Sequence, residues 1–140
     1  MSVQANKEVV RRLVEEWQGE HRREVGEELL ADDFVDSARQ TGPDISKRQA
    51  LDWWDATFRA FPDFSAQIKH MVGEGDLVAT YKTFSGTHAG EFMGIPPTGR
   101  KLTFDAFDLM QVRDGRVVDH WVVLDVAAVM RQTAGAIAGR

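Results

Sequence analysis

Cysteine is absent from this chain of 140 residues, and its absence removes several kinds of chemistry at once. Without a thiol there is no disulfide, no thiolate metal ligand and no cysteine nucleophile, and the absence fits a reducing compartment. No stretch approaches the roughly 18 consecutive apolar residues that a membrane span needs. Residues 1–7 also lack the apolar core of a secretory leader. We therefore expect a soluble cytoplasmic protein.

An excess of positive charge is also lacking, since the formal net charge is −5. Nucleic acids and anionic membranes both call for clustered Lys and Arg, so neither is expected as a partner. No repeat, linker or low-complexity segment divides the chain, and 140 residues can bury one core. We predict a single domain over residues 1–140.

Apolar periodicity predicts three helices in the first half of the chain, at residues 4–19, 24–31 and about 46–61. The third has the clearest start, because Ser46 and Gln49 form a capping box and Ile45 can pack on the first turn. Pro62 ends it. The large apolar side chains of this helix are expected mainly in the core. The alternative is that Trp54 or Phe58 reaches a cavity and stacks on a ring of a ligand. The large apolar side chains are Leu51, Trp54, Phe58 and Phe61.

After Pro62 the pattern changes to period two, which is typical of strands. Strands are predicted at 64–72, 77–84, 102–112 and 118–124, with a long loop at 86–99 and a short final helix from Val126. Helices followed by antiparallel strands indicate an α+β fold. We expect the N-terminal helices to pack on one face of a strongly bent, mostly antiparallel sheet.

The last two strands place two polar side chains on an apolar surface. Arg113-Asp114-Gly115 suits a three-residue hairpin loop, which would put Asp108 directly opposite His120. A two-residue loop would instead pair Asp108 with Trp121 and turn His120 to the other face.

An acid and an imidazole among apolar neighbours have two interpretations. Either they are a structural ion pair, or that face of the sheet encloses a ligand, as small-molecule pockets do. In the second case His120 could accept a proton while Asp108 orients it, or a protonated Asp108 could donate to an oxyanion. Asp108→Asn and His120→Ala should then each lower turnover more than tenfold.

Other polar residues give weaker signals. No spacing among His70, His88, His120 and the acids matches a metal-ligand pattern, so no metal is expected. No serine lies in a nucleophile-elbow context. His70 fits a surface position near a strand end. His88 either caps the pocket or ties the long loop to the body of the fold.

Two stretches carry a resemblance to a known family. The loop from Gly86 to Gly99, GTHAGEFMGIPPTG, and the hairpin from Val112 to Trp121, VRDGRVVDHW, resemble the SnoaL-like polyketide cyclases. The likeness covers nearly the whole chain. It implies an α+β barrel shaped like a cone, with the fold of ketosteroid isomerase, but it is weak evidence for any one substrate.

This resemblance implies a cofactor-free enzyme that closes a ring of an aromatic polyketide ester, such as an anthracycline precursor, by intramolecular aldol condensation. Asp108 matches a position held by a pocket histidine in the cyclases and by a neutral aspartic acid in ketosteroid isomerase. Asp36 matches a pocket asparagine, and His120 matches a histidine. The aspartate that serves as acid and base in the family is replaced by Val122.

The expected catalytic residues are therefore His120, Asp108 and Asp36. The side chains expected to bind an aromatic, polyketide-like substrate are Trp17, Trp54, Phe58, His88, Phe92, Ala106 and Val122. Loss of the family aspartate also fits the cofactor-independent hydroxylases of the same pathways.

A third alternative is a binding domain without catalysis. Homodimers or higher homo-oligomers are expected in any case, because one face of the sheet exposes apolar side chains. They are Phe107, Leu109, Trp121 and Val123.

Overall fold

A six-stranded sheet is the centre of the fold, with the strand order β2-β1-β6-β5-β4-β3. The computed structural model describes residues 2–37 and 43–135. Its strands are β1 (Leu30–Asp36), β2 (Ile45–Ser46), β3 (Ser65–Glu74), β4 (Leu77–Thr87), β5 (Lys101–Arg113) and β6 (Arg116–Leu124). Its helices are α1 (Val3–Arg12), the π-helical segment η1 (Leu13–Gly19), α2 (Arg23–Leu29), α3 (Lys47–Ala60) and α4 (Val126–Thr133).

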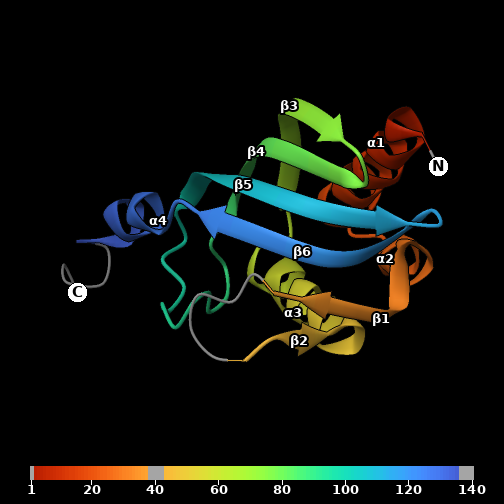
Figure 1. Cartoon of the computed structure of the whole chain (residues 1–140). Helices are drawn as coiled ribbons and strands as arrows, with labels where there is room; N and C mark the ends of the chain where they lie inside the picture. Colours follow the sequence, from red (N-terminus) through yellow and green to blue (C-terminus); the bar gives the residue numbers. More distant parts are fainter. Residues whose placement is uncertain (1, 38–42, 136–140) are drawn as a thin grey trace.

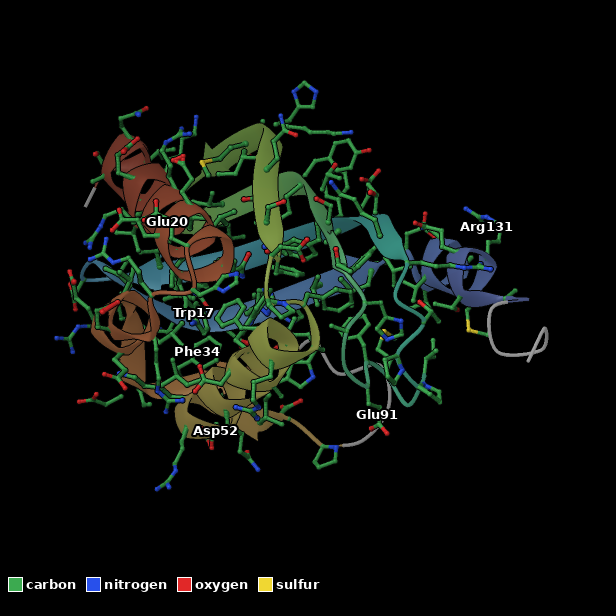
Figure 2. The ribbon with its side chains drawn as sticks, turned by 180° about the vertical axis from the view of Figure 1, so that it is seen from behind. Trp17, Glu20, Phe34, Asp52, Glu91 and Arg131 are labelled. Atoms are coloured by element: carbon green, nitrogen blue, oxygen red, sulfur yellow. The ribbon has the colours of Figure 1, made fainter. Side chains whose placement is uncertain are left out.

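The N-terminal helices cover one face of this sheet. Figure 1 shows the strands curving across the molecule, with α4 at the end of β6. Seen from behind, α1 and α3 lie in front of the strands, and Trp17 is among the side chains packed between the two layers (Figure 2). The α+β class and the bent sheet with helices on one face are thus confirmed, as expected when each element buries one apolar face.

Local sequence signals place the helices close to their predicted bounds. The Ser46 hydroxyl accepts from Gln49 N, and the Gln49 side chain accepts from Ser46 N, so the predicted capping box is present. The long first helix continues as η1, whose wider turns bury both Trp17 and Gln18. The predicted second helix is too long at its end, because β1 begins at Leu30.

The hairpin register predicted from the sequence is wrong. Asp114 and Gly115 have φ values of 52° and 76°, and Arg113 pairs with Arg116, so the loop has two residues and a type I′ geometry. Asp108 therefore does not face His120; it pairs with Val122, and His120 pairs with Met110.

A β-bulge in β6 places Asp108 and His120 on the same face of the sheet despite this register. Val117 pairs with Val112 and Asp119 with Gln111, so Val118 is an extra residue in β6. This residue shifts the alternation by one and returns His120 to the face that carries Asp108. The prediction of one shared face is confirmed, although the reason for it was wrong.

A second bulge changes the alternation in β3. The register shifts between Ile68 and His70, after which Met71 points toward the core and Val72 is 64% exposed. His70 is exposed and stacks on Tyr81. The predicted surface position of His70 is confirmed, whereas simple alternation through Val72 is not.

β1, which follows α2 directly, is a strand of the main sheet. β1 runs parallel to β6, and this pairing places Asp36 beside His120. Two distant parts of the chain thus meet at one point of the sheet.

The other face of the sheet exposes large apolar side chains. Phe107 and Val123 are 57% and 62% exposed, and Trp121 is also exposed. The expected homo-oligomer remains a prediction. Within the described part of the chain, no helix has both the length and the apolar character to cross a membrane.

Candidate functional site

A cavity of about 400 Å³ lies between the helices and the concave face of the sheet. This volume falls within the range of small-molecule sites. Most of the wall is apolar, with four polar side chains from different elements. The lining residues are Gln18, Asp36, Ile45, Ala50, Trp53, Trp54, Lys82, Phe84, Met93, His120, Val122, Leu124 and Val126.

Asp36 and His120 form the acid and imidazole pair on this wall. The parallel pairing of β1 with β6 sets them side by side, and His120 Nδ1 lies 3.2 Å from Asp36 Oδ1. Their side chains are 15% and 14% exposed, so both are largely removed from bulk water.

Asp108 lies deeper, behind the cavity lining, with a side chain that is fully buried. Its Oδ2 is 2.5 Å from Lys82 Nζ and 3.4 Å from His120 Nε2. Gln18 Oε1 accepts from the same Lys82 ammonium at 2.9 Å. A buried carboxylate is therefore shared by two cationic partners, which offsets the cost of removing it from water.

These contacts set the charges of the site. Burial raises the pKa of Asp108, but the Lys82 ammonium and the His120 imidazole outweigh it, so the pKa is lowered below its usual value. Burial lowers the pKa of His120, but hydrogen bonding to Asp108 and Asp36 and their charges raise it overall to about 9. At neutral pH these shifts favour a carboxylate at Asp108 and an imidazolium at His120.

The structure brings some of the residues expected to bind substrate into the cavity wall and leaves others outside it. Trp54 and Val122 line the cavity. Trp17, Phe92 and Ala106 are buried in the core, and Phe58 stacks on His21 at 4.1 Å between ring centroids. None of these four belongs to the lining of the cavity.

His88 ties the long loop to the fold, which is one of its two expected roles. It is fully buried, its Nδ1 is 3.0 Å from Thr98 Oγ1, and its ring stacks on Phe61. Burial lowers its pKa, which favours the neutral ring. The same loop contributes Met93 to the cavity.

Sequence reasoning missed Lys82, Gln18 and Trp53. A signal for Lys82 was present, because it alternates with Val78, Thr80 and Phe84 on the buried side of β4. A lysine on an inward face needs a buried partner. Gln18 had no such signal, since an ideal α-helix would not bury it together with Trp17.

Metal binding has no support in the described segments, 2–37 and 43–135. There, no group of three or more His, Asp or Glu side chains is arranged to hold a metal ion.

Comparison with known proteins identifies the family. The sequence model of the SnoaL-like polyketide cyclases matches residues 7–133. The chain is 29% identical over 113 residues to the nogalonic acid methyl ester cyclase of Streptomyces nogalater, covering 76% of this chain and 81% of the relative.

Solved structures agree with this match. IdmH of Streptomyces antibioticus, a proposed polyketide cyclase, is 34% identical, with a TM-score of 0.78 and coverage of 91% of this chain and 96% of IdmH. AclR of Streptomyces galilaeus, a proposed hydroxylase, is 26% identical, with a TM-score of 0.84 and coverage of 94% and 97%. The chain belongs to the SnoaL-like polyketide cyclase family of enzymes.

Proposed function

We propose that this enzyme closes a ring of an aromatic polyketide methyl ester by intramolecular aldol condensation. The observation that carries the proposal is the Asp36 and His120 pair on the wall of an apolar cavity, in a chain of this family. The substrate class follows the name of the nogalonic acid methyl ester cyclase. The apolar wall suits a planar aromatic substrate, and Trp53 and Trp54 offer ring surfaces for it.

We assign the role of proton acceptor to Asp36. It is the carboxylate that lines the cavity, whereas Asp108 lies behind the wall with Lys82. The raised pKa of His120 favours the imidazolium at neutral pH, which donates rather than accepts. The lowered pKa of Asp108 likewise disfavours the neutral acid that an oxyanion donor would require. We therefore propose this assignment in place of the two roles expected from the sequence.

The proposed reaction conserves atoms and needs no co-reactant. Asp36 takes a proton from a carbon next to a carbonyl, and the electrons of that C–H bond move onto the carbonyl oxygen as an enolate. The enolate carbon bonds to a second carbonyl carbon of the same molecule. The new alkoxide then receives a proton from the site, by way of Asp36 and His120. Proton transfers of this kind typically contribute about 10²–10⁴-fold each.

A hydroxylase is the second candidate. Val122, a cavity residue without a proton to transfer, stands where the resemblance places the acid and base of the cyclases. The likeness to AclR, a proposed hydroxylase, points the same way.

One experiment separates the two candidates. The protein is incubated with a panel of tricyclic and anthraquinone methyl esters, with and without O₂, and products are identified by mass spectrometry. Ring closure gives an isomer of unchanged mass, independent of O₂. A product that gains oxygen, together with O₂ uptake, would support the hydroxylase and contradict the cyclase. Ligand binding without any product would leave only a binding domain.

A further inference from the structure

Lys82 is a buried cation that the proposed reaction does not use. It is 1% exposed and reaches from the middle of β4 into the cavity wall. Its ammonium is held between Asp108 Oδ2 and Gln18 Oε1, at 2.5 and 2.9 Å. Burying an ammonium is costly even when it is paired, and an apolar residue at this position would fill the same space. The presence of a lysine at this position therefore suggests a functional role for its charge.

Lys82 stands at one end of a row of alternating charges. Asp108 Oδ2 contacts both Lys82 Nζ and His120 Nε2, and His120 Nδ1 contacts Asp36. With His120 protonated, the row from Lys82 through Asp108 to His120 has charges of +1, −1 and +1. These three residues carry a net charge of +1, and Asp36 carries the balancing −1.

The charge balance has a consequence for any anion in the cavity. When Asp36 takes up a proton, its negative charge moves to the ligand, and the net +1 of the other three residues stays in place. Without the charge of Lys82, Asp108 and His120 would sum to zero and would offer the anion no net counter-charge. Gln18 adds a neutral donor, because its Oε1 accepts from Lys82 and its amide nitrogen remains to donate.

We propose that Lys82 gives the cavity a fixed positive charge, so that the site binds planar aromatic ligands as oxyanions, that is, as enolates or phenolates, in preference to their neutral forms. This deepens the proposed function, because the enolate of ring closure is one such anion. Fixed charges in a cavity shielded from water act more strongly than they would in bulk solvent. Lys82 acts here through its charge and through its contact with Asp108, which in turn contacts His120. It is therefore a positioning residue.

Binding of naphthols of graded acidity tests the proposal at neutral pH. The absorbance spectra of naphthol and naphtholate differ, so the ionised fraction of bound ligand is measured directly. The wild type should bind the ionised form. Lys82→Gln, which can still donate to Asp108, should weaken naphtholate binding at least tenfold while neutral naphthol binding changes little. Lys69→Gln is the matched control, because Lys69 is exposed and lies over the Tyr81 ring.

The double variant Lys82→Gln/Asp108→Asn separates charge from direct contact. Because Asp108 also helps to keep His120 protonated, this variant is measured at a pH below the ordinary imidazole pKa of about 6.5. There a protonated His120 restores a net charge of +1, so naphtholate binding should recover. Binding of neutral naphthol by the wild type, unchanged naphtholate binding by Lys82→Gln, or no recovery in the double variant would each overturn the proposal.

Folding of each variant is checked by circular dichroism. Should Lys82→Gln not fold, Asp108→Asn alone provides the reciprocal test at the same pH below about 6.5, where His120 is protonated. There it adds positive charge and must tighten naphtholate binding, and weaker binding overturns the proposal. None of these measurements requires turnover. A protein inactive on the ester panel can still bind naphtholate, and an active cyclase that binds only neutral naphthol would lose this inference alone.

Discussion

Raising the pH from about 6.5 to about 9 should destabilise this protein through a single side chain, His120. Its pKa in the folded state is raised from 6.5 to about 9 by its two carboxylate partners. A group with a raised folded-state pKa contributes stability that is fully present below the unfolded pKa and is lost as the pH rises through the folded pKa. At about 1.36 kcal/mol per pKa unit, the difference corresponds to roughly 3 kcal/mol. This is an upper value, since His120 keeps slight contact with water.

Urea unfolding followed by circular dichroism, at several pH values from about 6 to about 10, measures this loss. His120→Gln is the control, because it retains a polar side chain but cannot titrate. The free energy of unfolding of the wild type should fall relative to that of the variant as the pH rises. A difference between the two proteins that stays constant over this range would show that His120 is not held as an imidazolium, and the assignment of Asp36 as proton acceptor would lose its support.

Three further predictions concern activity and packing. If Asp36 accepts the proton and His120 donates, kcat/KM in the ring-closure assay should fall as the pH rises through about 9; a rate that increases toward that pH would instead make His120 the base. Ser46→Ala removes the cap of α3 and should cost about 1 kcal/mol in urea unfolding, and an unchanged midpoint would contradict the role of the capping box. Gly26→Ala would bring its Cβ to 2.8 Å from atoms of Trp17 and Leu51, so calorimetry should show a loss of about 1–3 kcal/mol; a variant as stable as the wild type would contradict this tight packing.

Most of the fold could be predicted because its signals are local. The capping box at Ser46, the stop at Pro62 and the change from helical to alternating periodicity each depend on a few neighbouring residues. The hairpin register could not be predicted in this way. It depends on the bulge at Val118, which no turn signal announces, because an extra residue in a strand is selected by packing across the sheet.

In the candidate site, too, residues with local signals could be predicted, whereas contacts between distant parts of the chain could not. Asp108 and His120 were found because polar residues stand out in an apolar alternating pattern. The nearness of Asp36 to His120 depends on the parallel pairing of β1 with β6, a contact between residues 84 positions apart. Lys82 completes the site from β4, and its ammonium lowers the pKa of Asp108.

The most direct test of the central claim is the turnover of Asp36→Asn on a substrate that the wild type cyclises. The substitution keeps the size of the side chain and a hydrogen-bonding group beside His120, but it removes the proton acceptor. The account predicts that kcat falls by about 10²-fold or more while KM and the thermal midpoint change little. Turnover close to that of the wild type would contradict the account, because proton removal would then not depend on the carboxylate at this wall of the cavity.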